Sequence, residues 1–335
     1  MRIGIVTFCE AVNYGAYLQA FSLGEYLKEK GHMVFYISVI SLRQKFWEIH
    51  NLYSYHFDRI KFRNIYRKKY FQAKKKLNIV YKKAGYDLII IGSDEVWQLN
   101  NPTVSIRPEY WGMNLNAKKI ITYAVCANGA TANEIEKYPF IKQGISRIQA
   151  FSFRDKKTYE AFSKLIPNEK ETHVDPTFLI RLSKYTVASK QRKPYLLVYT
   201  YGFTEDKIKK TIAFARLKGL RIIAAGNKFD WCDESIPASP FEFLGLIKEA
   251  AYVVTDTFHG TVLSTHFEKQ FFTFANDKEK VLQFIKEFGL EDRNASVVST
   301  LAIIAENPID YTAVNMLLKT AIDNSQEYLT AFLEE

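Results

Sequence analysis

Three short polar turns contain the residue types best suited to hold a small anion. They read NYGA at 13–16, GSDEVW at 92–97 and TDTFHGT at 255–261. Each lies where an apolar, strand-like run gives way to the start of a helix. The free N–H groups and the dipole of a helix N-terminus favour anions, and ligands of open parallel sheets bind outside the carboxyl ends of the strands. The turns therefore predict a site for a phosphate- or carboxylate-bearing small molecule.

The turn at 255–261 is the most informative of the three. Asp256 and Thr257 are potential helix caps, and His259 with Gly260 opens the next helix. An imidazole there can donate to phosphate or carboxylate oxygens, or transfer a proton near neutral pH. The alternative is a hydrogen-bonded structural histidine, which is also how we interpret His266 among its apolar neighbours.

The turn at 92–97 offers a different set of contacts. Gly92 permits a tight turn, and Ser93 and Asp94 can hydrogen-bond ligand hydroxyls. Trp97 can present a flat face to a sugar ring, although a core tryptophan after a turn gives the same pattern.

Arg154 follows an apolar strand that ends at Phe153. Its guanidinium can form two parallel hydrogen bonds to a phosphate or carboxylate, or else pair with Asp155 at the surface. Asp175, before Pro176, is consistent with no more than a turn at a strand end. We assign chemical roles to Arg154 and His259. The predicted substrate-binding residues are Asn13, Tyr14, Gly15, Gln19, Gly92, Ser93, Asp94, Trp97, Thr257, Gly260 and Thr261.

Several common site motifs are missing from the sequence. It contains no GxGxxG, no GxxxxGK[ST] and no GxSxG, which argues against a standard dinucleotide fingerprint, a P-loop and a serine-hydrolase elbow. Cys9, Cys126 and Cys232 are far apart and lack metal-ligand spacing, and no carboxylate cluster suggests a metal. We therefore expect buried apolar thiols and no metal site. Cys9 follows the first strand, which places it near the predicted cleft.

The elements that position these turns alternate between strand and helix. IGIVTF at 3–8, a helix from about 15 to 30 and HMVFYI form a β-α-β unit, in which Asn13 is placed to cap the helix. A second alternating series begins at PYLLVYTYG after a charged linker at 183–193. We therefore expect an α/β fold with two Rossmann-like domains, 1–185 and 186–335, facing each other across a cleft. The helix at 311–333 is a candidate to pack back on the first domain.

The positive charge of the chain is concentrated in one segment. The sequence carries a formal net charge of +10, and residues 43–83 hold 13 Lys and Arg against two acids. We interpret this segment as an amphipathic helical hairpin inserted in the first domain. It forms either a solvated face covering that domain or a contact with anionic lipid, while nucleic acid is not expected because no binding motif accompanies the charge.

No apolar run is long enough to span a membrane, and the first residues lead directly into a strand. We expect a cytoplasmic protein, at the inner face of the membrane if the basic segment binds lipid.

Taken together, these segments resemble the polysaccharide pyruvyl transferase family. The matching segments run in the family's order over residues 3 to about 275: IGIVTFCEAVNYGAYLQAFSLGEYLKEKGH, YDLIIIGSDEVW, ITYAVCANG, FSFRD, VDPTFL and FEFLGLIKEAAYVVTDTFHGTVLSTHFEKQF. The sequence departs from the family pattern at Glu95, where Gln is more usual, and at Cys9-Glu10. The basic segment 43–83 has only loose counterparts.

The resemblance implies a fold similar to B-type glycosyltransferases. It also implies transfer of pyruvate from phosphoenolpyruvate to two hydroxyls of a sugar, giving a cyclic ketal without a cofactor. The family's phosphoenolpyruvate contacts fall on Arg154 and His259. Two alternatives stay open: a glycosyltransferase that uses a nucleotide sugar, and a non-catalytic module that binds a glycan or phosphate.

Overall fold

The computed structural model describes residues 1–40, 57–100, 106–166, 171–276 and 278–334. By contacts the chain divides into two compact units. The first unit comprises Met1–Tyr55, Lys74–Ile180 and Thr320–Glu335, and the second comprises His56–Ala73 and Arg181–Lys319. The division after Ile180 lies five residues before the predicted domain boundary.

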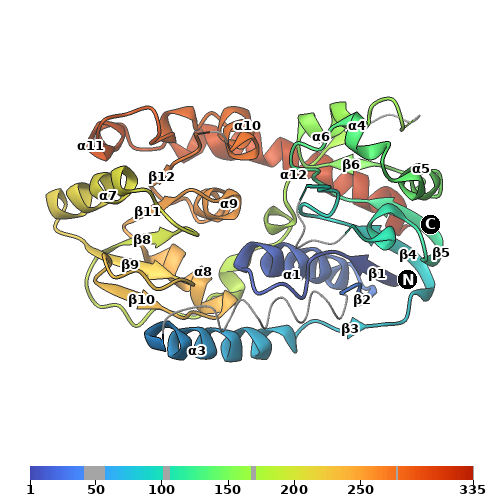
Figure 1. Cartoon of the computed structure of the whole chain (residues 1–335), viewed down its shortest axis with the longest axis horizontal. Coiled ribbons are helices and arrows are strands. Elements are labelled where there is room, and N and C mark those ends of the chain that lie inside the picture. The colour runs from blue at the N-terminus through green and yellow to red at the C-terminus, as the bar shows by residue number, and fades with distance from the viewer. Residues whose placement is uncertain (41–56, 101–105, 167–170, 277, 335) are drawn as a thin grey trace. The chain divides into compact units, whose positions relative to one another are not determined.

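The first unit is built on a parallel five-stranded sheet in the order β3-β2-β1-β4-β5 (Figure 1). Its strands are β1 (Arg2–Val6), β2 (Met33–Ile37), β3 (Ile79–Val80), β4 (Ala84–Ile91) and β5 (Asn116–Thr122), with a separate parallel pair, β6 (Ser152–Phe153) and β7 (Glu171–Thr172). Its helices are α1 (Tyr14–Glu29), η1 (Pro108–Trp111), α4 (Ala132–Ile135), α5 (Pro139–Ile145), α6 (Lys156–Phe162) and η2 (Pro176–Phe178).

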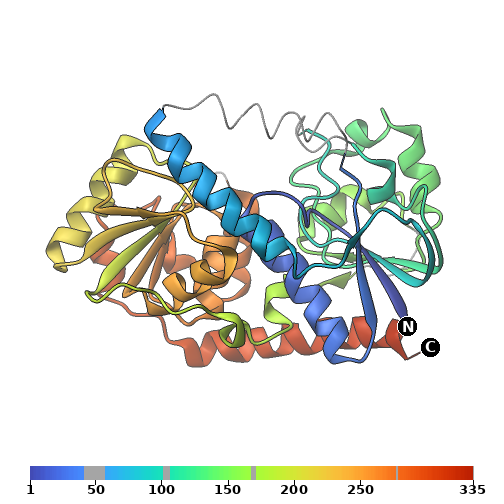
Figure 2. The ribbon, with the colours of Figure 1, turned by 90° about the horizontal axis from the view of Figure 1, so that it is seen from below.

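The second unit repeats the plan with the order β10-β9-β8-β11-β12, again entirely parallel (Figure 2). Its strands are β8 (Tyr195–Tyr199), β9 (Arg221–Ala225), β10 (Glu234–Ile236), β11 (Tyr252–Thr255) and β12 (Phe271–Thr273). Its helices are α3 (Phe57–Lys74), η3 (Leu182–Tyr185), α7 (Glu205–Leu217), α8 (Pro240–Glu249), α9 (Phe258–His266), α10 (Glu279–Glu287), η4 (Glu291–Arg293) and α11 (Leu301–Ala305). The last helix, α12 (Tyr311–Leu333), begins in the second unit and ends in the first.

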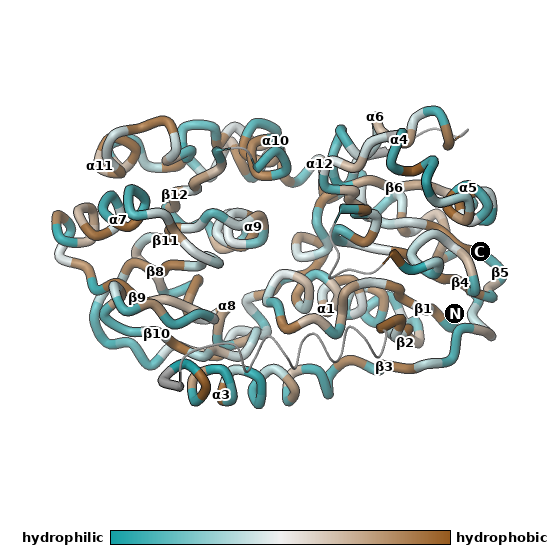
Figure 3. Tube along the Cα trace, viewed as in Figure 1, coloured by the Kyte–Doolittle hydropathy of each residue, from teal (hydrophilic) through white to brown (hydrophobic). Residues whose placement is uncertain are grey.

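Each sheet has the strand order of a Rossmann half, because the strands read 3-2-1-4-5 in the sequence of each unit. Central strands of such sheets are covered on both faces and are apolar throughout. Ile89, Ile90 and Ile91 of β4 are fully buried, as are Leu196 and Leu197 of β8. Hydrophobic stretches of the chain trace lie in strands of both units and in several helices as well (Figure 3).

The basic segment 43–83 differs from its predicted form. Residues 41–56 lie outside the described part, α3 covers 57–74, and the chain beyond it is not helical. Instead, β3 extends the first sheet by pairing Ile79 with Tyr36 and Val80 with Ile37. In β3 the backbone of Ile79 and Val80 is hydrogen-bonded to the edge of the sheet. A solvated helix would not give these two apolar residues a place in the sheet. The helix itself groups with the second unit, whereas the sequence placed it in the first domain.

The end of α12 is bonded to the core of the first unit. Ser325 Oγ accepts a hydrogen bond from the backbone N–H of Val174 at 3.1 Å, and the Tyr328 hydroxyl donates to the carbonyl of Thr122 at 2.9 Å. Tyr328 also packs against His173, with 4.6 Å between ring centroids. The C-terminal helix is therefore part of the structure that supports the loops of this unit.

Two buried histidines make the stability of the protein dependent on pH. Burial lowers the pKa of His173 and of His266 to about 4 from the usual 6.5. The unfolded chain then binds more protons than the folded one as the pH falls from 6.5 towards 4, so stability is lost in that window. We expect a loss of up to about 1.4 kcal/mol per pH unit for each histidine.

Urea unfolding of the wild type and of a His173→Gln/His266→Gln variant, measured between pH 7 and pH 4, tests this expectation. The variant should show a flatter profile of unfolding free energy. Equal slopes in the two proteins would contradict the assignment.

Candidate functional site

In each unit the strand order reverses between two neighbouring central strands, and loops that leave the carboxyl ends of those strands form the usual ligand site. The pair is β1 and β4 in the first unit, and β8 and β11 in the second. The turns at 13–16, 92–97 and 255–261 follow β1, β4 and β11, respectively. All three predicted turns thus lie at the place where such folds bind ligands.

The loops after β1 and β4 are tied together by α1. Asn13 caps the helix, as predicted, by accepting a hydrogen bond from the backbone N–H of Ala16 at 3.0 Å. Gln19 Nε2 donates to Thr7 Oγ1 at 2.9 Å, and Thr7 Oγ1 donates to the carbonyl of Ser93 at 2.8 Å. Tyr14, Gly15 and Gln19 are all buried. In this structure Gln19 supports the two loops from within, which differs from the direct substrate contact that the sequence predicts.

The turn at 92–97 depends on a glycine. Gly92 has a φ of +110°, and a Cβ there would lie 2.3 Å from the carbonyl oxygen of Tyr123. The buried Ser93 hydroxyl donates to the carbonyl of Ala124 at 3.1 Å, so this side chain also serves the loop. Asp94 adopts a left-handed φ of 77°, a strained conformation for a residue with a side chain. The turn is therefore built to present Asp94.

Arg154 lies between two carboxylates. Its Nη1 is 3.4 Å from Asp94 Oδ1 and 3.3 Å from Asp175 Oδ2, and its Nη2 is 3.4 Å from Asp94 Oδ1. The side chain of Arg154 is only 3 % exposed. Asp155, the partner considered from the sequence, instead caps α6 through the backbone N–H of Thr158. Burial of Arg154 therefore excludes the alternative of a surface pair with Asp155, and Asp175 has a role that the sequence did not indicate.

The charge of Arg154 is stable in this setting. Burial lowers its pKa, but the neighbouring Cys126, Asp94 and Asp175 raise it by more, so the net pKa is raised and the guanidinium stays protonated. Asp175 is held in turn by Thr177, whose backbone N–H and hydroxyl both donate to Oδ1. These contacts fix a cation at the carboxyl edge of the first sheet.

Trp97 does not offer a face to a sugar. It is 0 % exposed, donates its indole N–H to the carbonyl of Tyr110 at 2.7 Å, and stacks on Trp111 with 4.8 Å between ring centroids. Phe151, Phe153 and Phe162 complete the aromatic cluster around it. The prediction of Trp97 as a substrate contact is therefore wrong, and the core alternative holds because the apolar pocket buries the ring on all sides.

In the second unit the 255–261 turn begins α9 through a compact network. Thr257 Oγ1 accepts from the backbone N–H of Gly260 at 3.0 Å, and Thr255 Oγ1 donates to the carbonyl of Tyr199 at 2.7 Å. The latter bond joins the ends of β11 and β8. His259 is the second residue of α9 and is 9 % exposed, with its ring edge-on to Phe258 at 5.3 Å. Thr257 caps the helix as predicted.

Thr261 stays inside this network. Its hydroxyl, which is fully buried, bonds to the carbonyl of Thr257 and to Thr273 Oγ1, both at 3.1 Å. Thr261 therefore braces α9 against β12, whereas the sequence predicts a substrate contact.

Two lysines beside Asp256 form a part of this region that sequence reasoning missed, since the sequence indicated Asp256 only as a potential helix cap. Lys278 Nζ donates to Asp256 Oδ2 at 2.9 Å and also to the Asp256 carbonyl. Lys207 Nζ lies 3.9 Å from the same Oδ2 and 5.4 Å from the centre of the Phe274 ring. Lys207 lies in the first turn of α7 and Lys278 directly precedes α10, so no local spacing could have joined them. Together they add net positive charge beside the turn that carries His259.

The cysteines show no sign of catalytic chemistry. Burial raises the pKa of Cys9, Cys126 and Cys232 to about 12, so the thiols are protonated at neutral pH. Among the described residues, no group of three or more His, Cys, Asp and Glu side chains is arranged to hold a metal. Within the same part of the chain, no helix combines the length and apolarity that crossing a membrane demands.

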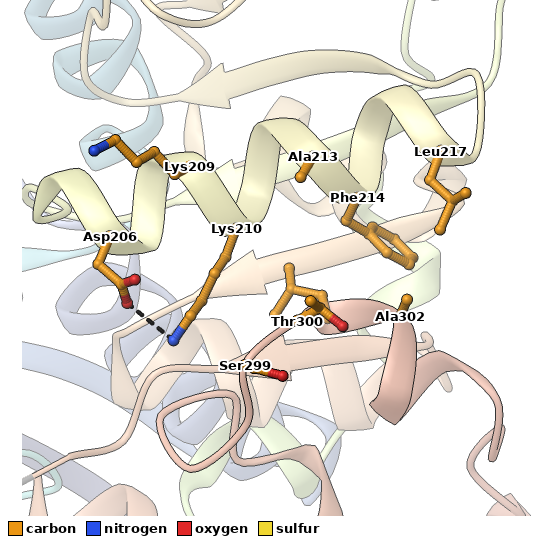
Figure 4. Close-up of a pocket in the computed structure, with 10 residues that line it drawn as sticks. Asp206, Lys209, Lys210, Ala213, Phe214, Leu217, Ser299, Thr300 and Ala302 are labelled. Atoms are coloured by element: carbon orange, nitrogen blue, oxygen red, sulfur yellow. Dashed lines mark ion pairs between the residues drawn. The ribbon is translucent and has the colours of Figure 1, made fainter.

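A pocket of about 480 Å³ lies elsewhere in the second unit, between α7 and residues 299–302. Lys210 reaches across its polar end to Asp206, while Phe214 and Leu217 form its apolar end opposite Ala302 (Figure 4). None of the residues that line it belongs to the predicted site. It carries none of the chemistry considered above.

Comparisons with known proteins agree with the predicted fold. Residues 13–278 match the model of the family described as polysaccharide pyruvyl transferase. A search of curated proteins gave no significant match. The structure of UDP-GlcNAc 2-epimerase from Neisseria meningitidis bound to UDP-GlcNAc is similar with a TM-score of 0.53 and 10 % identity, covering 99 % of each chain.

Two further structures were found at lower similarity. Spinosyn rhamnosyltransferase SpnG has a TM-score of 0.48 and 10 % identity over 100 % of this chain and 99 % of its own. MnaA of S. aureus with UDP has a TM-score of 0.48 and 13 % identity over 100 % and 98 %. The epimerase match, together with the two parallel sheets, confirms the α/β fold with two Rossmann-like units similar to B-type glycosyltransferases.

A substitution at Gly260 tests how much the capping network at the start of α9 contributes to stability. A Cβ at this position would lie 2.1 Å from Thr255 Oγ1 and 2.7 Å from Thr257 Oγ1, in the centre of the capping network. We expect Gly260→Ala to lower the free energy of unfolding by about 1–3 kcal/mol, as overpacking does. Gly202→Ala is the control, because a Cβ added there would meet no atom within 4 Å. Denaturant unfolding that gave equal values for the two variants would contradict this account.

Proposed function

Because the chain belongs to the polysaccharide pyruvyl transferase family, we propose that it transfers pyruvate from phosphoenolpyruvate to two hydroxyls of a sugar, forming a cyclic ketal. The acceptor is a glycan of the cell surface or its lipid-linked precursor. The proposed location is the cytoplasm, at the inner face of the membrane where such a precursor is available. No cofactor takes part, and phosphoenolpyruvate is the donor substrate.

One observation carries the proposal: the family match over residues 13–278 includes all three polar turns as well as Arg154 and His259. Phosphoenolpyruvate carries a phosphate and a carboxylate, and both are bound by cationic side chains or by N–H groups that donate hydrogen bonds. Arg154 provides a buried, permanently charged guanidinium in one unit. His259, in the first turn of α9, provides an imidazole in the other.

Arg154 is suited to exchange its present partners for a ligand. Its contacts with Asp94 and Asp175 measure 3.3–3.4 Å, longer than the ~2.7–2.9 Å of strong charge-assisted hydrogen bonds. A phosphate or carboxylate that approached the guanidinium would make shorter bonds, and the two aspartates would keep the side chain oriented. We propose that Arg154 binds phosphoenolpyruvate in this way.

His259 is proposed to take part in the transfer of pyruvate. For the reaction, a proton is added to the methylene carbon, which becomes a methyl group and leaves the neighbouring carbon electron-deficient. The first sugar hydroxyl bonds to that carbon and gives its proton to the group that protonated the methylene carbon. Phosphate then departs with its bonding electrons, and the second hydroxyl closes the ring and gives up its proton to the phosphate. An imidazole can move one of these protons or donate to the phosphate as it leaves.

A nucleotide-sugar-dependent glycosyltransferase is the second candidate. The observation that favours it is the fold shared with the epimerase that was solved with UDP-GlcNAc. Likeness at 10 % identity extends to fold alone, so the family match has the greater weight. Calorimetric titration of the whole protein with phosphoenolpyruvate and, separately, with UDP-GlcNAc distinguishes the two. We expect binding of phosphoenolpyruvate, and binding of UDP-GlcNAc alone would overturn the proposal.

Substitution of the two assigned residues tests the mechanism. We expect Arg154→Ala and His259→Ala each to lower turnover by more than tenfold, because each removes a group that contacts the donor. Arg154→Lys keeps the charge between Asp94 and Asp175 but loses the planar fork, so it should also be impaired. The measurement is release of inorganic phosphate from phosphoenolpyruvate in the presence of candidate glycans.

Two controls accompany these variants. Arg192→Ala removes an exposed arginine, and His32→Ala removes a histidine outside the three turns. Both should keep wild-type rates, and circular dichroism should show that all variants are folded. Wild-type rates in Arg154→Ala and His259→Ala would refute the assigned roles.

A further inference from the structure

Helix α3 presents a basic face to solvent. It contains seven Lys and Arg and a single acid, Asp58. Lys61, Ile65, Lys68 and Gln72 are all exposed and follow each other in steps of four, three and four residues. Residues at this spacing lie on one side of a helix. The exposed side of α3 therefore carries lysines with an apolar residue between them.

The opposite side of the helix is attached to the second unit. Lys69 Nζ contacts Glu242 Oε2 of α8 at 2.8 Å, and Arg59 Nη2 contacts Asp230 Oδ2 at 3.6 Å. Tyr70 and Ala73 are 1 % and 5 % exposed, respectively. Both of these ion pairs hold the inner side of α3 against the unit. Lys61 and Lys68 lie on the other side of the helix, where their charges face solvent.

Apolar side chains accompany the exposed charge. Ile65 is 40 % exposed and Phe71 is 50 % exposed, and Arg67 lies over the Phe71 ring at 5.6 Å from its centre. Figure 3 shows the helix as mainly hydrophilic with interspersed hydrophobic positions. Basic side chains with large apolar ones between them are suited to a surface that is both anionic and able to receive hydrocarbon.

We propose that this α3 face, defined by Lys61, Ile65, Lys68, Phe71 and Gln72, docks on the surface of a membrane that contains anionic lipids. Lysines would pair with lipid phosphates while Ile65 and Phe71 enter the interface between head groups and acyl chains. Anionic lipid is favoured over nucleic acid because the face is apolar as well as basic and holds no recognised nucleic-acid motif. The proposal goes beyond the proposed function, since membrane contact is measured without donor or acceptor.

Flotation of the full-length protein with vesicles tests the proposal. We expect binding to vesicles of phosphatidylcholine mixed with phosphatidylglycerol, weaker binding as the salt concentration rises, and none to phosphatidylcholine alone. Lys61→Gln/Lys68→Gln should weaken binding about 30-fold, from the usual contribution of a basic residue near an anionic surface. Ile65→Ser should reduce the binding that remains at high salt.

A matched control removes the same charge elsewhere. Lys156 and Lys209 are 73 % and 80 % exposed on α6 and α7, and Lys156→Gln/Lys209→Gln should bind vesicles as the wild type does. Equal loss in the two double variants would overturn the proposal, because it would show an effect of net charge alone. Equal binding to neutral vesicles, or tighter binding to single-stranded RNA than to anionic vesicles, would overturn it as well.

Discussion

The first unit is organised around one buried cation. Arg154 contacts Asp94 from the turn after β4 and Asp175 from the start of η2, so three separate loops meet at its guanidinium. A buried charge is costly unless it is paired, and this requirement fixes the conformation of all three loops. The left-handed backbone of Asp94 and the close approach of Gly92 to the carbonyl of Tyr123 are consistent with that demand. The geometry of the candidate site in this unit follows from satisfying Arg154.

In the second unit, hydroxyl groups have the organising role. Thr255, Thr257 and Thr261 link the end of β11 to β8, to the start of α9 and to β12 through short hydrogen bonds. The two units therefore reach the same topology by different local means: one orders its loops with charges, the other with threonines. Threonine hydroxyls carry no charge, and the positive charge beside this turn comes from Lys207 and Lys278.

Much of this could be predicted from the sequence, for physical reasons that act locally. Apolar runs identified the central strands, and Asn13 and Thr257 were identified as helix caps because a cap depends on residues three positions away. The Rossmann order is consistent with right-handed β-α-β connections between parallel strands. The sequence also predicted that Arg154 and His259 each follow the end of a strand.

What the sequence could not predict are the contacts between distant residues. The pairing of Arg154 with Asp175 and that of Asp256 with Lys278 join loops whose proximity only the fold creates. The side on which a residue is buried was also hidden: Gln19, Ser93, Thr261 and Trp97 lie next to the predicted site in sequence, but their side chains point into the protein. Burial on all sides depends on neighbours that no local pattern reveals.

The burial of two cysteines has a consequence for experiments on this protein. Cys9 and Cys126 are each 1 % exposed in the first unit, so an alkylating reagent can reach them only when that unit opens. Their rate of modification therefore reports how often the first unit opens, without an introduced label. Cys232, half-buried in the second unit, offers a separate signal from the same sample.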